Sequence, residues 1–207
     1  MKRGLGTLIL AMTFCSPIAT ASVVAFDDLA SGIYGDTLIY GDVTFKSQAG
    51  GKLEVTNQSA DGFGNAHSLP NKLSVWGDPP LTPKEKTSIL IFFNHTVQSV
   101  DFWLTGTFHD TTVNAYDKNG DLIDTFLQTF PLSGPVAPDG NPWDYYYDHV
   151  LNLIRLQGAA ISKVTIQPSA YDGFSIDDLA YAAIPEPSTV LLMIWGLLGL
   201  SFVKMKK

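Results

Sequence analysis

The sequence contains a single cysteine, Cys15, which lies in an apolar stretch close to the N-terminus. Two basic residues precede this stretch, and the small-x-small pattern Ala19-Thr20-Ala21 follows it. This order is typical of a secretory signal peptide over residues 1–21, so we expect export and a mature chain that starts at Ser22. Such a chain has no thiol, which excludes disulfides and any cysteine-based catalytic or metal site.

Basic residues are scarce between the two ends of the chain. Residues 22–184 hold 8 of the 13 Lys and Arg but 19 of the 20 Asp and Glu, so this segment carries a net charge of −11. Nucleic acids and anionic membranes need a basic protein surface. The composition therefore predicts no nucleic-acid partner, whereas an acidic surface suits solubility, cation binding or neutral partners.

Sequence motifs of enzymes are missing as well. The chain has no Gly-x-Ser-x-Gly elbow and no phosphate-binding glycine loop, and its four histidines are too widely separated for a metal motif. Carboxylates are plentiful, which leaves a two-carboxylate polysaccharide hydrolase open, but nothing singles out a pair. We therefore expect a protein that is not an enzyme.

Long amphipathic helices are absent from the pattern of residues 22–184, and strand signals take their place. Short runs rich in Val, Ile, Thr and aromatic residues alternate with Gly, Pro, Asn and Asp. This spacing predicts one all-β domain, an antiparallel β-sandwich of the jelly-roll type. Trp76 and Trp103 lie in strand patterns and are expected in the core. The expected strands are 23–26, 37–47, 52–56, 72–76, 88–93, 97–104, 111–116, 122–130, 161–167 and 173–181, with 150–156 open between a strand and a short helical turn.

The C-terminal residues 185–207 have three parts in a fixed order. Pro185, Glu186 and Pro187 come first, an apolar run of about 15 residues follows, and a cluster of lysines ends the chain. As a helix the run is roughly 22 Å long against a bilayer core of about 30 Å, which suits a transient span better than a permanent one. The lysines mark the cytoplasmic side.

These three parts resemble the PEP-CTERM sorting signal of Gram-negative bacteria. The resemblance implies recognition by an exosortase, a membrane cysteine protease-transpeptidase, in bacteria that make exopolysaccharide. It implies anchoring in the inner membrane through a C-terminal transmembrane sorting helix before processing, and a place at the cell surface or in the biofilm matrix afterwards. An ordinary membrane anchor with a chance Pro-Glu-Pro is the alternative.

Two acidic pairs, Asp27-Asp28 and Asp177-Asp178, lie at the first and last expected strands. The first and last strands of a jelly roll are commonly near each other, so these carboxylates could converge on a structural Ca²⁺. The alternative is that they solvate strand ends and cap turns. A third acidic stretch, Asp117 to Asp121, is similar to the start of an EF-hand loop, but Phe126 stands where a bidentate Glu is needed. We expect a hairpin turn there, because Asn-Gly between strands is a turn signal.

An aromatic segment, Trp143 to Asp148, follows a long Pro/Gly loop. The rings of Trp143, Tyr145 and Tyr147 could stack on a neutral glycan while the flanking carboxylates accept hydroxyl hydrogen bonds. The alternative is that these rings pack under the loop as a satellite core.

The acidic pairs in their strand context, Phe26–Leu29 and Ile176–Leu179, resemble jelly-roll domains that often precede PEP-CTERM tails. The hairpin Val113–Ile123 and the segment Ser99–Trp103 add to this resemblance. Such domains are similar in turn to galactose-binding-like carbohydrate modules. We expect an exported surface or matrix protein that associates with exopolysaccharide or binds glycans weakly. A purely structural matrix protein without a specific ligand is the second hypothesis, and a polysaccharide hydrolase is the third.

Overall fold

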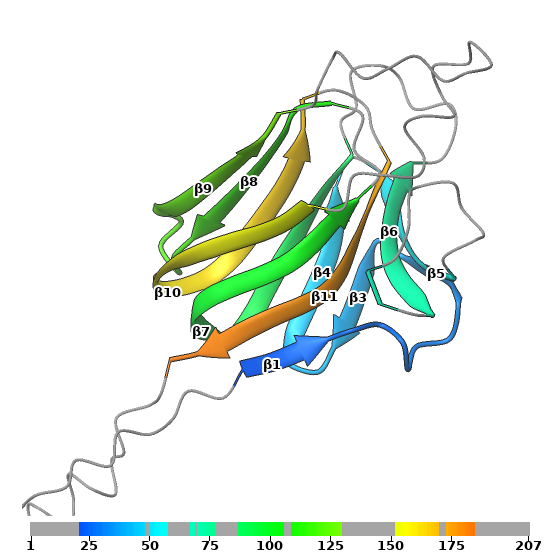
Figure 1. Cartoon of the computed structure of the whole chain (residues 1–207), viewed down its shortest axis with the longest axis horizontal. Coiled ribbons are helices and arrows are strands. Elements are labelled where there is room, and N and C mark those ends of the chain that lie inside the picture. The colour runs from blue at the N-terminus through cyan, green and yellow to red at the C-terminus, as the bar shows by residue number, and fades with distance from the viewer. Residues whose placement is uncertain are drawn as a thin grey trace, which may run out of the picture. The chain divides into compact units, whose positions relative to one another are not determined.

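Strands are the only regular elements in the computed structural model, which describes residues 21–48, 50–57, 67–68, 70–77, 87–105, 109–129, 152–169 and 173–184. Every strand pair among these residues is antiparallel, and the strands join in one hydrogen-bonded sheet (Figure 1). The expectation of an antiparallel all-β fold is confirmed. The strands are β1 Ala21–Val24, β2 Gly32–Gly35, β3 Thr37–Tyr40, β4 Val43–Gln48, β5 Gly51–Asn57, β6 Asn71–Gly77, β7 Ser88–Thr105, β8 Thr111–Tyr116, β9 Leu122–Gln128, β10 Asn152–Pro168 and β11 Phe174–Ala183.

The two longest strands, β7 and β10, pair with each other and take part in two layers. The first half of β7 pairs with β4, which pairs with β3, and the second half of β10 pairs with β8, which pairs with β9. These strands form the first layer. The second half of β7 pairs with β11, and β1, β6, β5 and β2 continue from β11 as the second layer. Phe26, just after β1, packs edge-on against Phe45 of β4 with ring centroids 5.4 Å apart, so the core lies between the layers.

The bend that carries β10 from one layer to the other is a bulge. Gln157 lies opposite Ser99 and Ile161 lies opposite Val97, so three residues of β10 face a single residue of β7. Ala160 in this bulge has a φ of 69°, a left-handed conformation that non-glycine residues rarely adopt. Bulges bend a strand and increase its twist, which is how a single strand can serve both layers.

Gly158 at this bend is in close contact with β9. A Cβ at Gly158 would lie 2.1 Å from Cγ2 of Ile123, a side chain that packs against the core. We therefore expect Gly158→Ala to lower the free energy of unfolding by about 1–3 kcal/mol, as measured by urea denaturation. The same substitution made in an Ile123→Ala background should cost clearly less. An equal cost in both backgrounds would mean that the contact with Ile123 is not the cause.

Alternation along β7 decides which side chains reach the core. Val100, Phe102 and Leu104 are fully buried, whereas Trp103 between them is only half-buried. Successive residues of a strand point to opposite faces, so Trp103 lies on the outer face of the second layer. The expectation of a core position for Trp103 is therefore wrong. The side chain of Trp76 lies outside the described residues.

Several expected strands differ from those observed. Residues 88–93 and 97–104 form one strand, β7, and 150–156 and 161–167 likewise fall within β10. The single strand expected over 37–47 is a hairpin of β3 and β4, which turns at Gly41, where φ is 57°. The short strand β2 was not expected, because glycine stands at both of its ends.

The expected hairpin turn between β8 and β9 is confirmed. The backbone N–H groups of Asn119 and Asp121 donate to Oδ1 of Asp117 at 2.8 and 2.9 Å, and Gly120 has a φ of 89°. These hydrogen bonds, with the one from Asp121 contributing most, lower the pKa of Asp117 below its usual value. The carboxylate of Asp117 therefore caps its own turn.

Several expected features lie outside the described residues. They are residues 1–20 of the expected signal peptide, whose last residue, Ala21, is the first residue of β1, the sorting tail with Pro185, Glu186 and Pro187, and the aromatic residues Trp143, Tyr145 and Tyr147. In the part of the chain that the structure does describe, no helix has the length and apolarity needed to cross a membrane.

Candidate functional site

The outer face of the second layer carries three cross-strand rows on β10, β7 and β11. Residues directly opposite each other in antiparallel strands point to the same face, and Trp103 fixes which face this is. Successive rows are about 7 Å apart, because each residue of a strand advances about 3.4 Å. We call these rows the outer strip, which consists of Leu153, Trp103 and Asp177 in the first row, Arg155, Asp101 and Ala180 in the second, and Gln157, Ser99 and Ala182 in the third.

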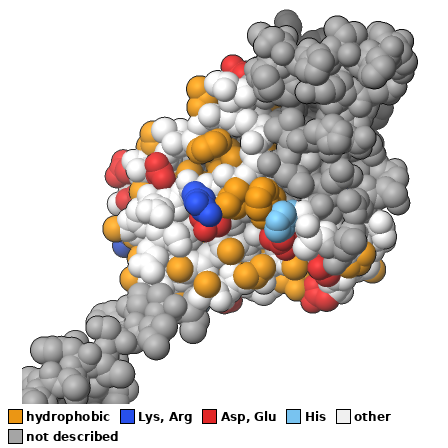
Figure 2. Space-filling view, in the orientation of Figure 1, with side chains coloured by type: hydrophobic (Ala, Val, Ile, Leu, Met, Phe, Trp, Pro, Cys, Tyr) orange, Lys and Arg blue, Asp and Glu red, His pale blue; other side chains and the backbone are white. Residues whose placement is uncertain are grey.

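The outer strip is polar and partly accessible. Arg155 and Gln157 are exposed, and Trp103, Asp101 and Ser99 are half-buried. In Figure 1 the strands β7 and β11 lie in front of β3 and β4, so this face points toward the viewer. Figure 2 shows basic and acidic side chains on it next to hydrophobic side chains and a histidine. The strip therefore combines apolar ring surface with hydrogen-bonding groups.

An imidazole covers the indole of Trp103. The ring centroids of His67 and Trp103 are 4.1 Å apart and the ring planes are within 10° of parallel, which is a stacked pair. Nδ1 of His67 lies 2.5 Å from Oδ2 of Asp178, and the His67 side chain is 40% exposed. The imidazole is thus held by one stack and one short polar contact at the edge of solvent.

The carboxylate of Asp177, on the strand next to that of Trp103, is buried, and both of its oxygens accept hydrogen bonds. Ser68 donates its backbone N–H to Oδ2 of Asp177 at 2.8 Å, and Asp178 donates its backbone N–H to Oδ1 at 2.9 Å. Burial disfavours the ionised form and raises the pKa of Asp177 to about 6, and the charge of Asp178 adds to this effect. The raised pKa means that the Asp177 carboxyl keeps its proton to a higher pH than an exposed aspartate does.

Asp178 occupies a bulge in β11. Asp177 lies opposite Trp103 and Ala180 lies opposite Asp101, so β11 has one residue more than β7 between these pairs. Asp178 has a φ of 48°, a conformation that Asp tolerates better than most residues. Its Oδ1 accepts a hydrogen bond of 2.8 Å from the hydroxyl of Ser68. The bulge thereby turns the carboxylate toward the 67–68 segment.

The two carboxylates of the other acidic pair contact different parts of the chain. Oδ1 of Asp27 accepts from the backbone N–H of Asn71 at 2.9 Å, and Oδ1 of Asp28 accepts from the hydroxyl of Tyr40 at 2.6 Å. Within the described ranges, no three His, Cys, Asp or Glu side chains are grouped so that they could hold a metal ion. Calcium binding by the four aspartates stays a prediction.

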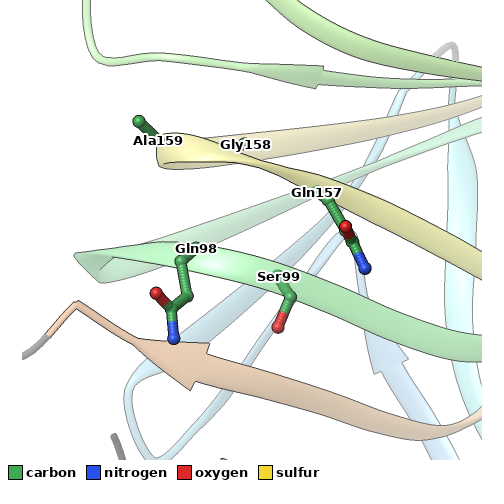
Figure 3. A pocket seen from close by; sticks show the side chains of 5 residues that line it. All are labelled: Gln98, Ser99, Gln157, Gly158 and Ala159. Carbon is green, nitrogen blue, oxygen red and sulfur yellow. The ribbon is translucent and has the colours of Figure 1, made fainter.

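A pocket opens where the third row meets the bend. It has a volume of about 500 Å³ and is lined by Gln98, Ser99, Gln157, Gly158 and Ala159. In Figure 3 the side chains of Gln98, Ser99 and Gln157 extend to the same side of the strands, whereas Ala159 extends away. The pocket therefore presents two amides and a hydroxyl to one side of the sheet.

A bulge in β7 explains why neighbouring residues share this pocket. Ala182 lies opposite Ser99 and Ala183 lies opposite Val97, so Gln98 is an extra residue of β7 relative to β11. Consecutive residues of a regular strand would point to opposite faces, but a bulge re-aims the extra side chain.

Only part of this site was expected from the sequence. Asp177 and Asp178 were candidate residues, whereas His67, Ser68, Arg155 and Gln157 were not. The alternation of apolar and polar residues over 154–157, with Ile154 and Leu156 buried and Arg155 and Gln157 exposed, is a signal that could have indicated Arg155 and Gln157. Nothing in the sequence around His67 indicates its stack on Trp103.

No family model matches the sequence, and no curated protein shows significant similarity to it. Solved structures do resemble the fold. The K1 cleaved adhesin domain of Lys-gingipain from Porphyromonas gingivalis W83 has a TM-score of 0.49 at 10% identity, covering 80% of this chain and 99% of that one. A mutant of the family 29 carbohydrate-binding module CBM29-2, complexed with mannohexaose, has a TM-score of 0.46 at 10% identity, covering 80% and 92%. The CBM22-1 xylan-binding domain of Xyn10C from Paenibacillus barcinonensis has a TM-score of 0.40 at 14% identity, covering 81% and 97%. Because all three TM-scores are below 0.5, we take the chemistry of the site from this chain's own residues.

Proposed function

We propose that the protein is an exported, non-enzymatic protein of the cell surface or extracellular matrix whose jelly-roll sandwich associates with exopolysaccharide through the outer strip. The observation that carries this proposal is the position of Trp103. A half-buried indole on the outer face of a sheet is in line with an Asp, an Arg and a Gln. An aromatic ring can stack on the apolar face of a sugar, and the polar groups can bind its hydroxyls.

His67 occupies the ring surface that a sugar would use. Its contacts are the stack on Trp103 and the polar contact to Asp178, and 40% of its side chain is exposed. A sugar ring that replaces the imidazole would gain both the indole face and the carboxylate of Asp178. We therefore treat His67 as an internal competitor for the glycan.

Replacing Trp103 and His67 by alanine should change glycan affinity in opposite directions. Trp103→Ala should weaken retention by the host's exopolysaccharide at least about tenfold, because a central aromatic anchor contributes more than about 1.4 kcal/mol. His67→Ala should strengthen retention by up to about tenfold, because a ring stack contributes about 0.5–1.5 kcal/mol that the ligand no longer has to overcome. Affinity electrophoresis in the exopolysaccharide measures both effects.

Trp103→Phe is the matched control, because it keeps a ring and should keep most of the retention. Urea denaturation of each variant separates a loss of binding from a loss of fold. A wild-type protein whose migration the polysaccharide does not retard would remove the glycan hypothesis and favour a structural matrix protein without a specific ligand. Turnover of the polysaccharide by the purified domain would instead favour a hydrolase.

The location of the protein is proposed from its two ends. The leader over residues 1–21 supports export, and Pro185, Glu186 and Pro187 with the apolar run and the lysines support recognition by an exosortase. The C-terminal helix would hold the protein in the inner membrane until the tail is processed. Release to the surface or matrix would follow.

Structural calcium remains part of the proposal. The carboxylates of Asp27 and Asp28, after β1, and of Asp177 and Asp178, in β11, are the hard oxygen ligands that Ca²⁺ prefers. A melting temperature that is the same in EDTA and in excess calcium would reject this site.

A further inference from the structure

We infer that the pocket at the bend is a second sugar subsite in line with Trp103, so that the ligand is a linear, neutral polysaccharide chain lying along β7. This inference rests on the proposed function and adds the class of ligand. The pocket is lined by residues of the third row of the outer strip, Gln157 and Ser99, together with Gln98.

The spacing of the two ends of the strip requires a chain. Ser99 and Trp103 are four residues apart on β7, which corresponds to about 14 Å along the strand. A single sugar ring is too small to touch the indole and the pocket at once. A chain of several sugars would lie over the second row between them.

The side chains between the two ends suit a ligand without charge. Asp101 and Arg155 lie directly opposite each other in the second row, so their charges offset one another. Gln98, Ser99 and Gln157 are uncharged, and each can both donate and accept a hydrogen bond, as sugar hydroxyls do. An anionic chain would instead meet the carboxylate of Asp178 at the Trp103 end and be repelled by the net charge of −11 of residues 22–184.

Small residues leave room for the chain along one side. The β11 positions opposite Asp101 and Ser99 are Ala180 and Ala182. Their side chains end at Cβ, so β11 forms a low border beside the polar side chains of β7. A polymer can therefore lie lengthwise on the strip.

The pocket is built by two irregularities of the backbone. Gln98 is the extra residue of β7 relative to β11, and Gly158 lies in the bulge of β10. Bulges are over-represented next to functional sites, where they re-aim side chains. Here they direct the two amides and the hydroxyl to one side of the strands (Figure 3).

Fragments of the host's exopolysaccharide, fractionated by length, provide the test. For the wild-type protein, affinity in isothermal titration should rise with fragment length and level off once the fragment spans both subsites. Gln157→Ala should weaken binding of the long fragments about fivefold and leave the shortest binding fragments unchanged. This substitution keeps the backbone N–H of Gln157, which donates to Oδ2 of Asp124 at 2.9 Å, so the strand should be preserved.

Gln167→Ala is the matched control, because Gln167 is also an exposed glutamine of β10 but lies in the first layer, and it should bind all fragments as the wild type does. Gln98→Ala is a second variant of the pocket and should behave as Gln157→Ala does. Alginate fragments of equal length supply an anionic comparison that should not bind.

The results of the titrations distinguish a failure of the second subsite from a failure of the proposed glycan binding. If no fragment binds the wild-type protein, the proposed function itself fails. If fragments bind equally at every length, or if both pocket variants bind long fragments normally, the second subsite is wrong while glycan binding stands. Binding of alginate fragments as tight as that of the host's fragments would overturn the neutral class of ligand.

Discussion

The free energy of unfolding is expected to fall by roughly 3 kcal/mol through Asp177 alone as the pH rises from below 3.8 to above 6. Burial raises the pKa of this carboxyl from its usual 3.8 to about 6 in the folded chain. The folded state therefore binds the proton more tightly than the unfolded state does. One pH unit corresponds to about 1.36 kcal/mol.

The direction of this effect follows from proton linkage. Below pH 3.8 both states are protonated at Asp177, and the stabilisation from the raised pKa is fully present. Between 3.8 and about 6 the unfolded chain releases the proton first, so stability declines. Above pH 6 the folded state holds a buried, ionised carboxylate, which accepts hydrogen bonds from the N–H groups of Ser68 and Asp178.

Asp177→Asn should lose this pH dependence. Urea denaturation of the wild type and the variant, at several pH values between 3.5 and about 7.5, gives the difference between their free energies of unfolding. The contributions of the other carboxylates are the same in both proteins and cancel in this difference. Asp121→Asn, at an exposed position of the β8–β9 turn, is the matched control and should follow the wild type. If the difference between wild type and Asp177→Asn does not change with pH, Asp177 does not have a raised pKa.

Replacing Pro185, Glu186 and Pro187 by alanines is expected to abolish removal of the tail and leave export intact. In the proposed sorting route the leader would act before translocation and the motif would be read afterwards, and prolines favour an extended chain that a processing enzyme can reach. Mass spectrometry of the surface-released and membrane-bound protein measures the result. Wild-type protein should be found shortened, and the variant should stay in the membrane at full length.

Trp195→Leu is a matched control for the tail, because it changes the apolar run without losing its hydrophobicity. It should be processed as the wild type is. Equal processing of the alanine variant and the wild type would reject the sorting signal. A variant that is no longer exported would show that the tail acts earlier than we propose.

Local signals in the sequence predicted the parts of the fold that depend on few residues. The β8–β9 hairpin was expected because Asn119 and Gly120 specify a tight turn between two strand patterns, and its bounds differ from the expected ones only at the end of β9. The hairpin of β3 and β4 was missed, although Gly41 and Asp42 stand at its turn. There the apolar runs on both sides are short, and the turn signal was read as part of one strand.

Where the strands begin and end, and which of their faces is buried, also depends on pairing between strands that are distant in the sequence. Two separate strands were expected over 88–93 and 97–104, yet β7 is one strand, which pairs with β4 and β10 before the expected break and with β10 and β11 after it, while the pairing with β10 skips residues 93–96. Trp103 was expected in the core because it lies in a strand pattern, but Phe102 and Leu104 on either side of it occupy the buried face. The two-residue period of the strand, which puts Trp103 on the face opposite Phe102, was the better guide to its position.

In the candidate site too, residues adjacent in the sequence were predicted, whereas contacts between distant segments were not. Asp177 and Asp178 were candidate residues because two adjacent carboxylates are visible in the sequence. Their partners His67 and Ser68 are more than 100 residues away, and no sequence pattern connects the two segments. The outer strip depends on the register of three strands, which becomes known only from the pairing of β10, β7 and β11.

The last strand of the domain lies in the interior of the second layer. β11 pairs with β7 on one side and with β6 and β1 on the other, and Ala21 at the start of β1 is opposite Ala182. A chain that emerges from its N-terminus, in synthesis or in export, therefore lacks the centre of this layer until almost all of the domain has emerged. The closing step joins the first and last strands of the domain, which is the entropically costly kind of contact that slows β-sheet folding. The unpaired edges of β7 and β6 are exposed until then, so this interval is when the domain is most open to aggregation or to protection by a chaperone.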